Sequence, residues 1–183
     1  MVSGTTSWSW PLGVACALLI GSLNAQTEPP ITLELGGDSI LLTDLPMRIF
    51  LPLTLSVAGD FRTSEISFGV SFPPRMTTFV EATKGPVAEA VQATVDTQLE
   101  KAQSGRRIVR FKISASEAIP EGELLKLTFD VSKAAGVEDR IILRIFDLTV
   151  KSADIEAPMK GKGTNGVITI EHVPLHACFF YMH

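Results

Sequence analysis

Apolar and polar residues alternate along most of the chain from residue 31 onward. In the segment "ISFGVSF", residues 66–72, four large apolar side chains occupy every second position, with small residues between them. This period of two places the apolar side chains on one face of a β-strand and leaves the other face almost flat. Two prolines follow at once, and they end the strand because proline cannot donate to a hydrogen-bond ladder.

The same alternation predicts further strands, separated by turn sequences such as "PEGE" and "GKGTNG". Pro52 interrupts one of them, so we expect that strand to lie at a sheet edge or to carry a bulge. Several short alternating strands joined by turns are typical of an antiparallel β-sandwich. The predicted strands lie at residues 31–35, 47–57, 66–72, 107–114, 124–131, 140–150 and 165–171.

The segment "VAEAVQATVDTQLEK", residues 87–101, fits two periods. Its valines and Leu99 lie four residues apart, as on one face of a helix, but a period of two also runs through its second half. Ala, Glu and Gln favour a helix, whereas the rest of the chain has the pattern of β-strands. Both alternatives stay open from the sequence.

Length and composition indicate one globular domain. The chain has 183 residues, of which 45% are hydrophobic, and this is enough to bury a sizeable core. The net charge of -4 comes without any basic run that could neutralise a phosphate backbone. We therefore expect no nucleic-acid partner.

The N-terminal run "WSWPLGVACALLIGSLNA" predicts a secretory signal peptide at residues 1–25, cleaved before Gln26. The run is too short and wrongly flanked for a membrane span, so we expect a secreted chain with no transmembrane span. The alternative is lipidation at Cys16, which follows small residues. Cleavage would leave Cys178 as the only cysteine, so no intramolecular disulfide is expected.

Three segments of the chain occur in a characteristic order, and they are "ISFGVSFPPRMTTFVEATKGPV", "EGELLKLTFDVSKAAG" and "TNGVITI". Together they resemble the cohesin domain, the non-catalytic receptor module of cellulosomes. The resemblance spans residues 45–171. It implies an all-β jelly-roll sandwich of about nine strands, whose dockerin partner binds the outer face of one sheet. Carbohydrate-binding modules have a similar outline. The resemblance divides the chain into a signal peptide (1–25), an N-terminal strand and lead-in (26–44), the sandwich (45–171) and an irregular apolar tail (172–183).

The chain departs from the family pattern at one place. Where cohesins carry Tyr-Asp-Pro, this sequence has Phe72, Pro73 and Pro74. The acidic residue is missing, so dockerin contacts made through it do not carry over.

The outward face of the strand at residues 66–72 is the predicted partner-binding face. If the strand at residues 107–114 lies beside it, as the resemblance implies, two basic side chains flank a flat floor, and a third lies on the next strand. A flat floor with a basic rim suits an acidic, hydrogen-bonding protein partner. The alternative is an ordinary solvated sheet face. The predicted face consists of Ser67, Gly69, Ser71, Arg110, Lys112 and Arg144.

The sequence offers little catalytic chemistry. Residues 26–171 contain neither His nor Cys, the usual general base and the thiol nucleophile. Carboxylates in predicted turns, such as Glu121 and Glu123, show no spacing that would place two of them across a cleft as in a glycosidase. We expect neither an enzyme nor a cofactor.

Potential metal ligands gather only in the tail. They are three histidines and a cysteine, but Pro174 breaks any helix that would align the first two, so we expect no metal site. The ligands are His172, His176, Cys178 and His183.

We therefore expect a secreted, non-catalytic binding module associated with polysaccharide degradation, which docks a dockerin-bearing or other extracellular protein. A first alternative is direct binding of polysaccharide, as a carbohydrate-binding module or a cell-surface adhesin. The absence of Trp and Tyr between residues 26 and 171 disfavours it, because sugar rings stack on those side chains. A second alternative is a structural domain of the cell envelope.

Overall fold

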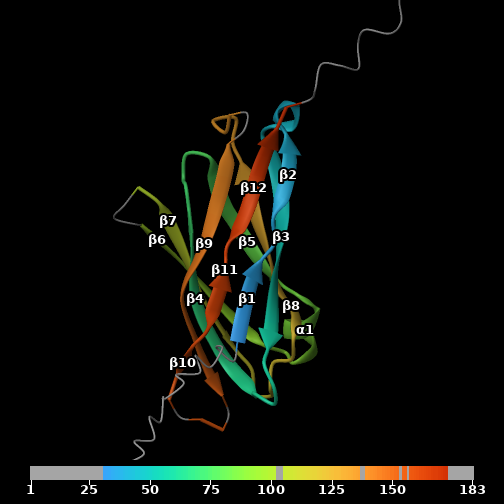
Figure 1. Cartoon of the computed structure of the whole chain (residues 1–183), viewed down its shortest axis with the longest axis vertical. Helices are drawn as coiled ribbons and strands as arrows, with labels where there is room; N and C mark the ends of the chain where they lie inside the picture. Colours follow the sequence, from blue (N-terminus) through green and yellow to red (C-terminus); the bar gives the residue numbers. More distant parts are fainter. Residues whose placement is uncertain (1–30, 102–104, 137–138, 153, 156, 173–183) are drawn as a thin grey trace, which may run out of the picture.

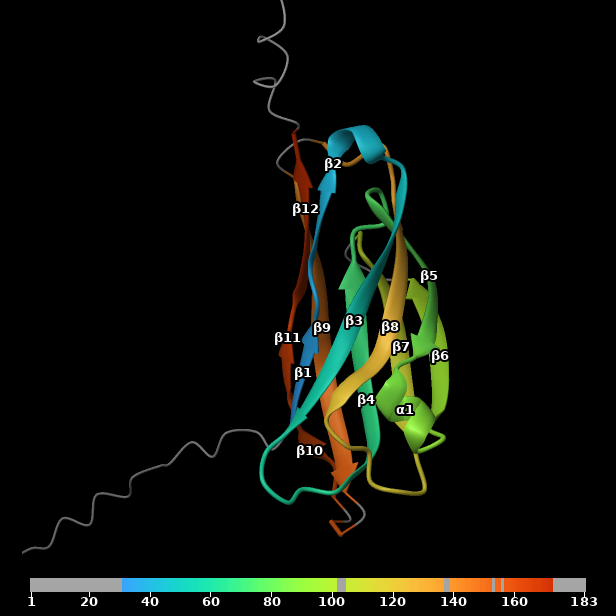
Figure 2. The same cartoon turned by 90° about the vertical axis from the view of Figure 1, so that its right-hand side faces the viewer.

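A computed structural model describes residues 31–101, 105–136, 139–152, 154–155 and 157–172. The described chain forms two facing β-sheets whose strands run along the long axis (Figure 1). Strands β4 (Thr63–Phe72), β7 (Arg107–Ser114) and β9 (Arg140–Ser152) of the larger sheet lie at the left of that view. Strands β3 (Met47–Val57) and β8 (Gly122–Val131) of the smaller sheet lie at the right. The smaller sheet faces the viewer in Figure 2. The predicted signal peptide lies outside the described residues, as does the tail beyond His172.

The smaller sheet has the order β11 (Lys162–Thr164), β1 (Ile31–Leu35), β3 (Met47–Val57), β8 (Gly122–Val131), β5 (Thr77–Lys84). The larger sheet has the order β2 (Asp38–Leu41), β12 (Gly166–Glu171), β9 (Arg140–Ser152), β4 (Thr63–Phe72), β7 (Arg107–Ser114), β6 (Thr94–Lys101), with β10 (Met159–Lys160) paired to β9. Two short helices, η1 (Leu42–Asp44) and α1 (Pro86–Ala90), join strands. No helix in the described ranges is long and apolar enough to cross a membrane. The predicted all-β jelly-roll sandwich is confirmed.

Both ends of the described chain switch from one sheet to the other. β1 pairs in parallel with β11 in the smaller sheet, and their continuations β2 and β12 pair in parallel in the larger sheet. Glycines allow the crossing, because a Cβ on Gly166 would lie 2.6 Å from the carbonyl oxygen of Gly36. These split segments, together with the two-residue β10, raise the number of strands above the nine expected from the resemblance.

The N-terminal strand β1, expected as a lead-in before residue 45, is part of the sandwich core. β1 pairs with β3 along its whole length, and Ile31 and Leu33 are completely buried. The described smaller sheet therefore includes the strand at residues 31–35.

Alternation places the core between the sheets, as predicted. The inward residues of β4, β7 and β8 are buried, and four phenylalanines join the two layers. The ring of Phe72 on β4 meets Phe129 of β8 edge to face at 5.5 Å, and Phe79 of β5 meets Phe111 of β7 at 5.9 Å. Such aromatic pairs add to the free energy gained by burying their area.

The ambiguous segment at residues 87–101 contains both structures. Its beginning belongs to helix α1, with Pro86 at the first helical position, and its second half forms strand β6. A strand was not predicted at residues 77–84, where β5 lies. A register shift between Phe79 and Glu81 interrupts its alternation, and this bulge hides the period of two.

Pro52 lies in an interior strand, not at an edge. β3 pairs with β1 on one side and with β8 on the other. The β3–β8 register shifts between Leu53 and Thr54, next to the proline, so the expected bulge is confirmed and the expected edge position is wrong.

Candidate functional site

The outer face of the larger sheet brings the predicted site residues together. β4 lies between β7 and β9, and each of its outward residues has a cross-strand neighbour on both sides. The pairing places Ser67 beside Lys112, Gly69 beside Arg110, and Ser71 beside Arg144. The predicted neighbourhood of the three strands is therefore confirmed at the level of single residues.

The floor of this face is not flat at its centre. The ring of Phe146, on β9, lies over Gly69, so that a Cβ on Gly69 would overlap the ring. Arg110 lies on β7, the other neighbour of β4, and its guanidinium carbon is 5.4 Å from the centroid of the same ring. An aromatic ring and a cation at this separation attract one another. The missing side chain at Gly69 thus gives room for a contact between β9 and β7.

A bulge in β9 supplies a carboxylate to the same place. The β4–β9 register shifts at this level, and Asp147 has a left-handed φ of 52°. Both Phe146 and Asp147 consequently reach Arg110, whose Nη1 lies 3.4 Å from the Asp147 carboxylate. Glu100 of β6 accepts from Arg110 Nε at 3.1 Å. These hydrogen bonds, the one to Glu100 first, raise the pKa of Arg110 above its ordinary value.

Carboxylates neutralise two members of the expected basic rim, Arg110 and Lys112. Glu65 lies 3.2 Å from the Nζ of Lys112 and 2.8 Å from the Nζ of Lys151. The hydrogen bond from Lys151, followed by that from Lys112, lowers the pKa of Glu65. Lys112 and Lys151 share the carboxylate of Glu65, whereas Arg110 pairs with two carboxylates, those of Glu100 and Asp147. The two clusters together therefore carry no net charge.

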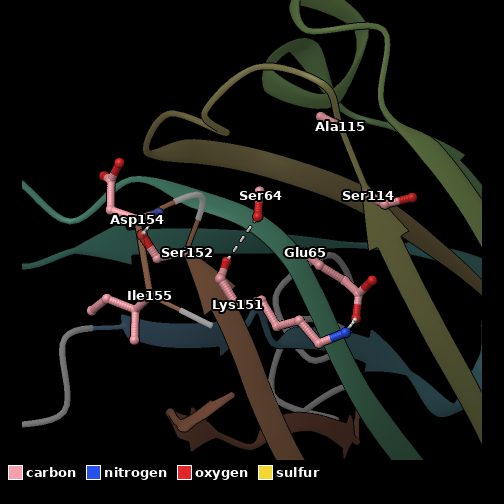
Figure 3. Close-up of a pocket in the computed structure, with 8 residues that line it drawn as sticks. All are labelled: Ser64, Glu65, Ser114, Ala115, Lys151, Ser152, Asp154 and Ile155. Atoms are coloured by element: carbon pink, nitrogen blue, oxygen red, sulfur yellow. Dashed lines mark hydrogen bonds and ion pairs between the residues drawn. The ribbon is translucent and has the colours of Figure 1, made fainter. Parts of the chain in front are cut away.

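An open hollow lies at one end of the face, where β4 begins and β7 and β9 end (Figure 3). Ser64 donates through its Oγ to the carbonyl oxygen of Lys151 at 3.3 Å, beside the Glu65–Lys151 ion pair. Ile155 adds an exposed apolar side chain. Hydroxyl, charged and apolar groups therefore adjoin one another at this end of the sheet.

The opposite end of the face holds a residue that the sequence analysis did not single out. Arg106 lies just before β7, and its Nη2 donates to the carbonyl oxygens of Ser71 at 2.9 Å and of Ile142 at 2.6 Å. Its Nε lies 3.3 Å from the Ser71 hydroxyl. Burial, and then the charge of Arg144, lowers the pKa of Arg106. The only sequence signal that pointed to Arg106 was the double arginine after the turn in "SGRR". The alternation of apolar and polar residues gives no information on Arg106, because this residue lies outside the strand.

No set of three or more His, Cys, Asp or Glu in the described ranges is placed to hold a metal ion. Of the four tail residues considered as zinc ligands, only His172 is described. The others lie outside the described residues.

These observations define an all-β sandwich with a charged outer face, and solved structures share its fold. A non-cellulosomal cohesin from the archaeon Archaeoglobus fulgidus is 17% identical, with a TM-score of 0.61 over 84% of this chain and 99% of that one. A type III cohesin from a cell-surface anchoring scaffoldin of Ruminococcus flavefaciens is 14% identical, with a TM-score of 0.63 over 82% and 93%. A type I cohesin of Clostridium thermocellum, solved in a cohesin–dockerin complex, is 10% identical, with a TM-score of 0.62 over 80% and 96%.

The chain therefore has the cohesin fold. No protein-family model matches the sequence, and a search of curated proteins finds no match either. Because the structural neighbours are far below 25% identity, the likeness extends to the fold, and the role of this chain has to be argued from its own residues.

Proposed function

We propose that the chain is a non-catalytic docking module that binds a dockerin-type or other extracellular protein through the outer face of its larger sheet. The observation that carries the proposal is the cohesin fold, since several similar structures are cohesins solved together with dockerins. The lack of His and Cys between residues 26 and 171 supports a role without catalysis. Secretion through residues 1–25 and a link to polysaccharide degradation are further parts of the proposal, and they rest on the sequence.

The outer face suits a protein partner because its polar groups are already positioned. Arg110 is held by Glu100, Asp147 and the ring of Phe146, and Glu65 is held by two lysines. A partner that docks here loses little side-chain entropy in ordering these groups, because they are ordered beforehand. Their alternating charges favour a partner with a complementary pattern.

A capture experiment tests the proposal. The secreted chain, immobilised, is exposed to the extracellular and envelope proteins of its source, and also to a panel of purified dockerins. We expect capture of a dockerin-type protein. We also expect the variant R110E/K112E to lose that capture. It places acidic groups beside Glu100, Asp147 and Glu65, so the charge pattern of the face no longer complements that of the partner.

The matched control is R48E. Arg48 lies on β3 in the smaller sheet and pairs with Asp130 at 2.8 Å, so R48E also breaks an exposed ion pair, but on the opposite side of the sandwich. R48E is expected to retain capture. Equal capture by R110E/K112E and the wild type would discard this face, and failure to capture any dockerin or other protein would discard the docking function.

The two alternatives have their own readouts. Retention of the chain on insoluble polysaccharide, with no protein captured, would favour a carbohydrate-binding module. Self-association in size-exclusion chromatography that disappears when residues 173–183 are removed would favour a structural envelope domain.

A further inference from the structure

Two neighbouring cations on the outer face, Arg106 and Arg144, lack the carboxylates that neutralise Arg110 and Lys112 in the described chain. Among the described residues, no carboxylate lies within ion-pairing distance of Arg106 or Arg144, whereas Arg110 and Lys112 have acidic partners on neighbouring strands. Arg106 uses backbone carbonyls instead. The whole chain is acidic, with a net charge of -4, so a local excess of positive charge is not a general property of its surface.

The fold holds these two like charges close together. Arg144 is the direct cross-strand neighbour of Ser71, and Arg106 donates to both the backbone and the hydroxyl of Ser71. Opposed side chains on adjacent antiparallel strands have Cβ atoms about 5 Å apart, so Arg144 begins beside the same serine that Arg106 contacts. No carboxylate among the described residues offsets the repulsion between the two arginines, and a bound anionic group would relieve it.

We propose that Arg106 and Arg144, the arginine pair, receive a carboxylate side chain from an acidic segment of the docked polypeptide. This inference rests on the proposed docking function and names the chemistry of the partner at one end of the face. Arg144 suits a carboxylate because the planar N–H donors of its guanidinium group can bind both carboxylate oxygens. Arg106 already donates through Nε and Nη2 to Ser71 and Ile142, so it contributes its charge and its remaining donor, Nη1. Arg106 is partly held by the protein before binding, so less of its side-chain freedom is lost.

The neighbourhood of the arginine pair favours a polypeptide over a free anion. Ile142, 37% exposed, lies between Arg140 and Arg144 on the outward side of β9 and offers an apolar contact. Arg140 lies four positions from Arg144, a separation of about 13 Å along a strand. An extended segment with two acidic residues four positions apart could therefore reach the arginine pair with one and Arg140 with the other.

Titration with a synthetic peptide tests the inference without a known partner. The probe is acetyl-Ala-Asp-Ala-Ala-Ala-Glu-Ala-amide, compared with the same peptide carrying Asn and Gln, and binding is followed through the Arg Nε–Hε signals in NMR. We expect saturable shifts of the Arg106 and Arg144 signals with the acidic peptide alone. We expect R144Q to weaken binding about tenfold, because it removes one charge-assisted pair.

The matched control is K126Q. Lys126 lies on β8, exposed on the outer face of the smaller sheet, and no ion pair in the described chain uses it. K126Q should bind the acidic peptide like the wild type. R144Q leaves Arg106 and its carbonyl contacts in place, and a dispersed amide spectrum of R144Q verifies that the variant is folded.

Each outcome bears on one of the two proposals. Absence of shifts, or equal binding by R144Q and the wild type, would overturn the arginine pair as a carboxylate receptor, even if capture through Arg110 and Lys112 persisted. Peptide binding that depends on Arg144, without capture of any protein, would support the receptor and discard the docking function. Tighter binding of trigalacturonate than of the peptide would overturn the assignment to a polypeptide, since an acidic sugar would then be the better ligand.

Discussion

Phe146 on β9 and Arg110 on β7 meet across Gly69 of the strand between them, with the guanidinium carbon 5.4 Å from the ring centroid. Glycine usually weakens a strand interior, since it loses more backbone freedom on folding than other residues and offers no side chain to pack. Here the ring of Phe146 occupies the space that a side chain at position 69 would fill. The contact between these two residues accounts for a glycine in the middle of an otherwise regular strand.

The variant G69A is expected to destabilise the fold by about 1–3 kcal/mol, because its Cβ would overlap the Phe146 ring and force that ring away from Arg110. In an F146A background the same change should have the opposite sign and stabilise by about 0.5–1 kcal/mol, because alanine is then better than glycine in a strand. Chemical denaturation of the four proteins of this double-mutant cycle measures both values. Additive effects of G69A and F146A would contradict the packing argument.

Acid should weaken the cluster around Glu65. Its pKa is lowered below the ordinary 4.5, chiefly by the hydrogen bond from Lys151. A carboxyl group with a lowered folded-state pKa stabilises the fold fully above its unfolded pKa, and this contribution is lost as the pH falls from about 4.5 through the folded value. The effect should be at most about 1 kcal/mol, because the ion pairs are partly exposed to solvent.

The variant E65Q checks this expectation. Its free energy of unfolding should be lower than that of the wild type at pH 7, and the difference should shrink below pH 4.5. Asp154 lines the same hollow and forms no ion pair with the described residues, so D154N serves as the control and should keep the acid-dependent contribution of Glu65. A constant difference between E65Q and the wild type from pH 7 to pH 3 would contradict the role of the ion pairs.

Phenylalanines at two depths should differ sharply in their contribution to stability. Phe129 is completely buried and contacts both Phe72 and Phe79, whereas Phe50 on the neighbouring strand is 56% exposed. F129A should cost about 3–5 kcal/mol through lost burial and a cavity between the sheets. F50A should change stability by about 0.5 kcal/mol or less, as an exposed substitution does. Thermal unfolding of the two variants distinguishes them directly, and similar melting temperatures would refute the assigned positions.

The crossing of the terminal strands makes a separate prediction. A Cβ at position 166 would lie 2.6 Å from the carbonyl oxygen of Gly36, and backbone cannot move aside as a flexible side chain can. G166A should therefore destabilise the fold by about 1–3 kcal/mol. At Gly136 the nearest atom is 3.4 Å from the added Cβ, so G136A is the control and should be nearly neutral. Equal stabilities, measured by urea denaturation, would show that the crossing tolerates a side chain.

The alternation of apolar and polar residues correctly predicted the features that depend on a single strand. It distinguished the buried from the outward residues of β4 and β7, and the resemblance placed Arg110 and Lys112 beside Ser67 and Gly69. It could not predict how Phe146 uses the space above Gly69. That contact depends on a bulge at Asp147, and the bulge depends on the pairing of β9 with β4.

Charges were harder to predict than positions. Glu65 and Glu100 neutralise Lys112 and Arg110 in the expected basic rim, and each reaches its partner from another strand, so sequence spacing does not reveal the pairing. Arg106 escaped notice because it precedes β7 and acts through backbone carbonyls. The parallel partners of β1 and β2 were hidden for a similar reason, since they are strands more than 100 residues away in the sequence.

The parallel pairing of β1 with β11 and of β2 with β12 also constrains how the protein is made. The first strands to leave the ribosome find these partners only after Glu171 has been synthesised. Until then Ile31 and Leu33, buried in the finished fold, have part of their neighbourhood missing. Contacts so distant in sequence slow folding, because a long loop must be closed before they form. The sandwich thus stays incomplete until residues 162–171 have been made, and β1 and β2 find their parallel partners in a late step of folding.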